Sequence, residues 1–157
     1  MQVLEQLKKT SPERFLSIYE SLAQHGYGPL DGEVAKALRF RPHAIRTVPM
    51  AQRARRAKSI LETAKNTELA YEILGAYLIK NHRELVTGFL DKTGVKHDQG
   101  MIEDVDHNKP AAAKVAGVVA ELDKTYAPED VTIYLAIAAE QWPDVKELDE
   151  LWRKRIG

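Results

Sequence analysis

Apolar residues recur along most of this chain at intervals of three and four positions, the spacing that places side chains on one face of an α-helix. The first clear stripe consists of Phe15, Ile18, Tyr19 and Leu22. It follows Ser11 and Pro12, which favour the N-cap and the first position of a helix. The pattern therefore predicts a helix that begins near residue 12.

Similar stripes predict further helices in the middle of the chain. After Pro49, apolar residues stand four, three and four positions apart, at Met50, Ala54, Ala57 and Leu61. From Thr67 the next stripe is formed by Leu69, Ile73, Leu74, Tyr77 and Leu78. We expect another helix to begin near Asn81 and to end at Gly94, because glycine readily adopts the left-handed conformation that ends helices.

Residues that favour the first or last position of a helix predict the remaining helices. Asp31 is a suitable cap for a short helix that must stop before Pro42. Pro110 and Pro128 each stand where a helix is expected to begin. Asp144 is the expected cap of a last helix, which carries Trp152.

These segments add up to about eight helices, each too short to be stable alone in water. No strand-like alternation of useful length is present, so we expect an all-α fold, a compact irregular bundle or array without a sheet. The 157 residues suit a single domain. A soft boundary is expected in loop 94–108, between an N-terminal helical group and a C-terminal three-helix group.

Composition narrows the classes of function. The chain has no cysteine, which excludes disulfides, thiolate metal sites and cysteine nucleophiles. No apolar run is long enough for a membrane span, and residues 1–9 lack the apolar core of a signal peptide. We therefore expect a cytoplasmic protein without membrane contact. The sequence contains no nucleophile elbow and no phosphate-binding glycine loop, and it indicates neither a catalytic residue nor a cofactor.

Basic residues are concentrated in one segment of the chain, and acidic residues are in excess in the rest. Residues 34–61 contain eight of the 23 basic residues and no acidic one, so the rest of the chain has 15 basic against 23 acidic residues. The candidate binding residues in this segment are Arg39, Arg41, His43, Arg46, Arg53, Arg55 and Arg56. Our main hypothesis is a non-catalytic interaction or ligand-binding domain that presents residues 36–58 to an acidic or anionic partner. In one alternative, these arginines cover apolar surface and pair with carboxylates of the same chain. In another, Arg41, Arg46 and Arg53 bind a small anion near the helix start at Pro49.

Residues 34–48 resemble the helix-turn-helix motif of DNA-binding proteins. Ala35 is the small residue where the two helices of that motif cross, and Pro42 would open the recognition helix. The resemblance implies DNA contacts from His43, Arg46 and Thr47, with Arg41 near a phosphate. The segment departs from the motif at Arg39, where the turn usually has glycine, and at Pro49, which shortens the recognition helix.

A third hypothesis concerns the polar segment 97–107, which contains two histidines and four acidic residues. Imidazole and carboxylate are ligands for borderline and hard metal ions. The candidate ligands are His97, Asp98, Asp104 and His107, and they would make the protein a metal-dependent enzyme. The alternative is an exposed connecting loop, because the spacing does not match a calcium-binding loop.

Overall fold

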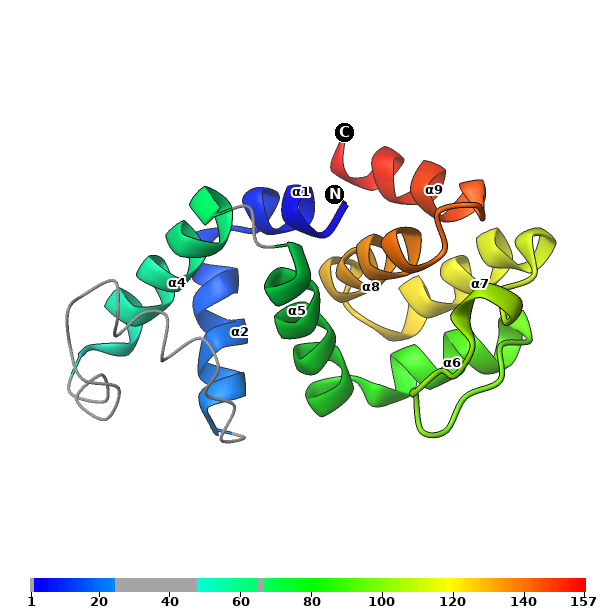
Figure 1. Ribbon diagram of the computed structural model, residues 1–157, viewed down its shortest axis with the longest axis horizontal. Helices are drawn as coiled ribbons and strands as arrows, with labels where there is room; N and C mark the ends of the chain where they lie inside the picture. Colours follow the sequence, from blue (N-terminus) through cyan, green and yellow to red (C-terminus); the bar gives the residue numbers. More distant parts are fainter. Residues whose placement is uncertain (1, 25–47, 65–66) are drawn as a thin grey trace.

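The computed structural model describes residues 2–24, 48–64 and 67–157, and within these ranges the protein is an all-α array without a sheet (Figure 1). The described part has eight α-helices: α1 (Gln2–Lys9), α2 (Pro12–Gln24), α4 (Met50–Ala64), α5 (Thr67–Asn81), α6 (Arg83–Thr93), α7 (Ala112–Thr125), α8 (Pro128–Gln141) and α9 (Lys146–Ile156). A short 3₁₀ turn, η2 (Val105–His107), lies between α6 and α7. The predicted fold class is confirmed.

Most of the expected helix starts and ends are confirmed. Helix α2 begins at Pro12, and the Ser11 hydroxyl accepts a hydrogen bond from the Arg14 amide at 3.1 Å. Helix α8 begins at Pro128, as the sequence predicts. Gly94 ends α6 with a φ of 82°, a left-handed conformation in which a side chain would be strained.

Other boundaries differ from the prediction. Helix α7 begins at Ala112 rather than Pro110, because Ala111 is extended and its amide donates to the Thr93 carbonyl at 2.9 Å. Asp144 does not cap α9: Val145 is the N-cap residue, and the Asp144 carboxylate pairs with Lys109 instead. Helix α1 was not predicted, and the helix expected after Asp31 lies outside the described residues.

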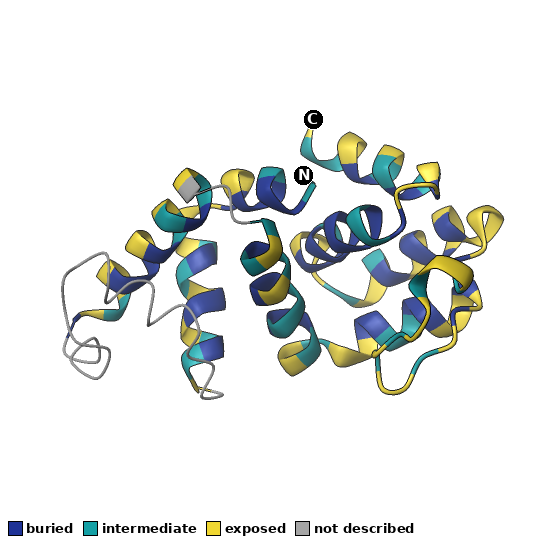
Figure 2. Ribbon diagram, in the orientation of Figure 1, coloured by how far each residue is buried: buried dark blue, intermediate teal, exposed yellow. Residues whose placement is uncertain are grey.

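Helix α8 occupies the centre of the core. Nine of its residues are buried, from Asp130 to Ala139 with the exception of Thr132, and α1, α5, α7 and α9 all pack against it. Figure 2 shows α8 almost entirely in the colour of buried residues, whereas α4 has exposed residues along its outer side. Helices α2 and α4 pack against each other at one end of the molecule, and α6 and α7 at the other (Figure 1).

The two tryptophans anchor the core, as expected for large aromatic side chains. Trp142 and Trp152 are essentially inaccessible to solvent. The indole N–H of Trp152 donates to the Gln6 side chain at 2.9 Å, which joins the first and last helices, and that of Trp142 donates to the Val105 carbonyl at 3.3 Å. None of the described helices has the length and apolar character that crossing a membrane would require.

Candidate functional site

The part of the basic segment that the structure describes is helix α4. It carries Arg53, Arg55, Arg56 and Lys58, and its only acidic residue is Glu62 near the C-terminal end. Ala54, Ala57 and Leu61 face the protein and are buried, as their spacing predicts. The candidates Arg39, Arg41, His43 and Arg46, with nearly all of the helix-turn-helix-like segment, lie outside the described residues.

The basic side chains of α4 have different environments. Arg53 is buried, with 8% of its surface exposed, and its Nε atom has no hydrogen-bond partner. Lys58 pairs with Glu62 one turn further along the helix. Arg55 and Arg56 are exposed, and neither forms an ion pair with any carboxylate in the described ranges. Within the described residues, the guanidinium groups of Arg55 and Arg56 are therefore without an ion-pair partner.

Two hollows flank these arginines. The groove between α2 and α4 measures about 370 Å³, and Arg55 and Lys58 line it together with Glu13 and Glu62, so its charge is mixed. The second hollow measures about 300 Å³, and the described residues that line it are Gln52, Arg55, Arg56 and Ser59, none of them acidic. The second hollow is therefore the better place for an anionic group.

A polar network that the sequence did not predict joins α2, α5 and α8. Asp130, in the first turn of α8, has only 4% of its side chain exposed. Its carboxylate pairs with Arg14 of α2 and accepts a hydrogen bond from the Tyr77 hydroxyl of α5 at 2.9 Å. The second carboxylate oxygen lies 3.2 Å from His82 Nε2, at the N-cap of α6. Glu129 adds an ion pair to Arg14 at 3.2 Å.

The network changes the proton affinities of two of its members. Burial, with the Asp130 carboxylate next in importance, raises the pKa of Tyr77 to about 12. Burial alone would lower the pKa of Arg14, but the attraction of Asp130, with Tyr77 and Glu129, outweighs it and raises that pKa. The ion pair of Arg14 with Asp130 and the neutral hydroxyl of Tyr77 therefore stabilise each other. Such a network fixes how α2, α5 and α8 meet.

A signal for this network exists in the sequence, although it is weak. Asp130 and Glu129 follow Pro128, where acidic residues are usually explained by the helix dipole. Asp130 stands directly before the apolar run of α8, and this position indicates a buried carboxylate that needs a partner. The partners Arg14 and Tyr77 are far away in sequence, so their approach depends on the tertiary fold.

The candidate metal ligands His97, Asp98, Asp104 and His107 line one open hollow of about 750 Å³, but their side chains form separate contacts. His97 Nε2 lies 2.6 Å from the Asp91 carboxylate, and its Nδ1 accepts a hydrogen bond from the Gly100 amide at 3.0 Å. His107 contacts Asp104 separately, at 2.8 Å. Asp98 forms a backbone bridge with Met101. Among the residues that the structure describes, no three His, Asp or Glu side chains are arranged to hold a metal ion.

Comparison of the chain with protein-family models, curated proteins and solved structures found no match. The arguments for its function therefore rest on its own residues.

Proposed function

We propose that this protein is a non-catalytic interaction module whose helix α4 binds an acidic segment of a partner protein. One observation carries the proposal: Arg55 and Arg56 are exposed on a helix that has no acidic residue before Glu62, and no described carboxylate pairs with them. The longer segment 34–61, to which α4 belongs, is equally free of acidic residues.

Another arginine of the same protein provides the comparison. Arg155 of α9 forms two hydrogen bonds with the Asp123 carboxylate, at 2.7 and 2.8 Å, and donates to Thr132 at 2.8 Å. Its guanidinium group is fully used inside the structure. Arg55 and Arg56 have no such contacts among the described residues, although the rest of the chain has an excess of acidic residues. This difference supports an external role for the α4 arginines.

The spacing of α4 suits carboxylates. Gln52, Arg55, Arg56 and Ser59 stand at helical intervals of three and four, so they share one face around the hollow described above. A guanidinium group donates two parallel hydrogen bonds to a carboxylate, and the amide and hydroxyl neighbours supply further donors. An acidic peptide that crosses this face would place one carboxylate on each arginine.

The balance of charge favours an acidic protein segment over a nucleic acid. Outside residues 34–61 the chain has eight more acidic than basic residues. The isoelectric point of the whole chain is near 7. A long polyanion would be attracted to one face and repelled by the remainder, whereas nucleic-acid-binding domains are usually basic as a whole. A short acidic segment needs only the local field of α4.

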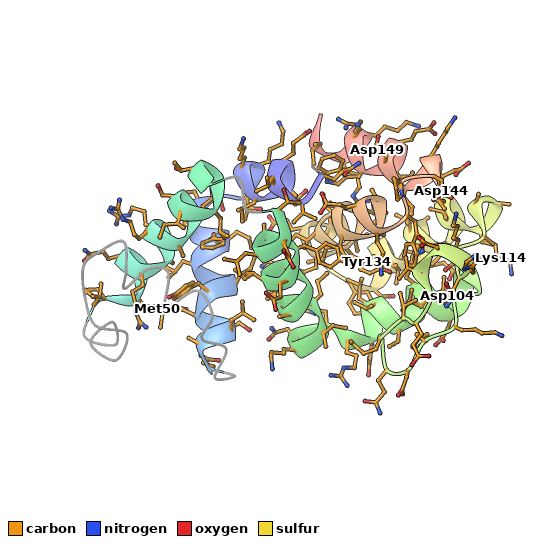
Figure 3. All side chains as sticks on the ribbon, viewed as in Figure 1. Met50, Asp104, Lys114, Tyr134, Asp144 and Asp149 are labelled. Atoms are coloured by element: carbon orange, nitrogen blue, oxygen red, sulfur yellow. The ribbon has the colours of Figure 1, made fainter. Side chains whose placement is uncertain are left out.

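The test is binding of a fluorescently labelled oligoglutamate peptide, compared with a labelled DNA duplex, at about 50 and 200 mM salt. We expect the peptide to bind, and the double variant R55Q/R56Q to weaken that binding about ten-fold, since two charge-assisted contacts are lost. The matched control is K114Q/K124Q, which removes two exposed positive charges from α7 at the opposite end of the molecule (Figure 3 labels Met50 of α4 and Lys114).

Three results would contradict the proposal. The first is absence of peptide binding at the lower salt concentration. The second is an equal loss of affinity in the α4 and α7 variants, because net charge rather than α4 would then be responsible. The third is steeply salt-dependent binding of the DNA duplex without binding of the peptide, which would favour the helix-turn-helix hypothesis instead.

A further inference from the structure

A separate cavity lies between α5 and α8, beside the segment that links α6 to α7. It measures about 250 Å³ and is formed mainly by apolar side chains. Its walls come from three parts of the sequence: Gly75 and Ile79 of α5, Tyr134 of α8, and the turn that contains Gly100 and Met101. Figure 3 labels Tyr134 near the middle of the molecule, away from Met50 of α4.

Gly75 keeps one wall of this cavity open. It stands in the middle of α5, where glycine destabilises a helix relative to alanine. A Cβ atom at this position would meet no other atom within 4 Å, so close packing does not require glycine here. A larger side chain at residue 75 would instead occupy the space that the cavity now has.

The rim of the cavity is a fixed two-residue turn. Asp98 and Met101 exchange two backbone hydrogen bonds, at 2.8 and 2.9 Å, and the residues between them, Gln99 and Gly100, both have positive φ. His97 holds this turn by accepting a hydrogen bond from the Gly100 amide while its other ring nitrogen contacts Asp91. The mouth is therefore a preformed part of the fold.

Met101 adds an independent indication that the mouth meets a ligand. It is 69% exposed and is the only large hydrophobic side chain classed as exposed among the described residues. An exposed methionine at the edge of an apolar cavity supplies a flexible and polarisable contact surface.

The lining residues indicate the chemistry of the ligand. Among the described residues that line the cavity none is charged, and the polar side chains are those of Tyr71, Tyr134 and Gln141. Burial raises the pKa of both tyrosines, and Glu140 is a second cause for Tyr71, so both hydroxyls are neutral hydrogen-bonding groups. The nearby carboxylate of Glu140 disfavours an anion. A cavity of about 150 Å³ is enough for benzene, so this one has room for roughly ten non-hydrogen atoms.

We infer that this cavity is a binding site for a small, uncharged aromatic molecule with one hydrogen-bonding group. The aromatic ring lies between the apolar faces of α5 and α8, and the polar group reaches the tyrosine hydroxyls or the Gln141 amide. The site is distinct from the basic face of α4, because the two share no lining residue.

Indole is the probe for the test, and binding is followed by two-dimensional NMR of the ¹⁵N-labelled protein together with calorimetry. We expect a dissociation constant on the order of 0.1 mM, with shift changes at Gly75, Gly100 and Met101. Benzoate has the same number of non-hydrogen atoms but carries a negative charge, and it should bind at least ten-fold more weakly.

The blocking variant is Gly75→Leu, which should reduce indole affinity at least ten-fold. Its matched control is Gly117→Leu, at a glycine in the middle of α7 that also has open space at its Cβ position and does not line the cavity. If Gly75→Leu does not fold, Gly75→Ala takes its place, with an expected loss of about three-fold. Absence of indole binding, equal affinity of both variants, or equal affinity for benzoate would overturn the inference.

Discussion

Helices α4 and α8 have nearly the same length, 15 and 14 residues, but they contribute to the protein in opposite ways. Helix α8 buries nine residues and is surrounded by α1, α5, α7 and α9. Helix α4 is buried only along Arg53, Ala54, Ala57 and Leu61 and packs mainly against α2. Its small alanines allow close packing, while Arg55 and Arg56 point to solvent.

The difference separates a helix that forms the centre of the core from a helix whose outer face is exposed to solvent. A helix that is apolar on all sides must be central, and nearly any change in it alters packing. A helix with one narrow buried stripe has a free outer face that can change its chemistry without disturbing the core. The polar network around Asp130 connects the two regions, because Arg14 belongs to α2, the helix on which α4 packs.

The largest expected effect tests the central position of α8. Leu135→Ala should lower the free energy of unfolding by about 4 kcal/mol, because the leucine is fully buried in a crowded site that cannot collapse. Leu61→Ala on α4 should lower it by only about 2 kcal/mol: Leu61 is equally buried, but α4 lies at one end of the molecule and packs mainly against α2, so its surroundings can relax more easily. Urea denaturation measures both values. Equal losses would mean that α4 is packed as tightly as α8.

A smaller effect is expected for the network that joins the two regions. Tyr77→Phe removes the hydrogen bond to Asp130 and should lower the free energy of unfolding by about 1 kcal/mol at neutral pH. The folded pKa of Tyr77 is about 12 against 10 for a free tyrosine, so the unfolded chain loses this proton first as the pH rises. The stability that Tyr77 provides is therefore complete below pH 10 and is lost as the pH rises towards about 12.

Denaturation curves between neutral pH and about pH 12 measure this dependence. We expect the wild-type stability to fall more steeply than that of Tyr77→Phe over the upper part of this range. Identical slopes for the two proteins would show that the Tyr77 hydroxyl is not coupled to the folded state as the structure indicates.

The smallest expected effect concerns the free arginines. The double variant R55A/R56A should change the free energy of unfolding by no more than about 0.5 kcal/mol, because neither side chain has a partner among the described residues. Arg155→Ala should lower it by about 2 kcal/mol, since its bidentate contact with Asp123 is lost. Thermal and urea unfolding of both variants provide the measurement. A marked destabilisation by R55A/R56A would assign α4 a structural role.

Helix positions were predictable from the sequence wherever an apolar stripe was preceded by a capping residue or a proline that starts a helix. Ser11 with Pro12 and the alanines after Pro49 are examples, because local preference and burial favour the same structure there. Asp144 shows the opposite case: its capping preference is real, but pairing with Lys109 from a distant loop replaces it. Helix α1 was missed although it carries the buried stripe Val3, Leu4 and Leu7, because no capping residue precedes so short a stripe.

The sites were less predictable, because they depend on residues that are distant in sequence. The absence of acidic residues from 34–61 predicted a basic surface that includes α4. Only the structure distinguishes the exposed Arg55 and Arg56 from the buried Arg53 and from Lys58, which pairs with Glu62. The cavity had one local sign, Gly75 in the middle of an otherwise good helix. Its other walls come from α8 and the turn at Gly100, which no local pattern relates to α5.

The hydrogen bond between Gln6 and Trp152 has a consequence for the synthesis of the protein in the cell. Residues 6 and 152 are 146 positions apart, and Gln2 and Asp149 form a second contact between the same two helices. When α1 leaves the ribosome it has no α9 to meet, and at ordinary translation rates it waits roughly 10 s or more. During that interval the hydrogen bonds between α1 and α9 cannot form, and α4 and α5, which leave the ribosome earlier, provide the first surfaces of the folded protein on which α1 packs.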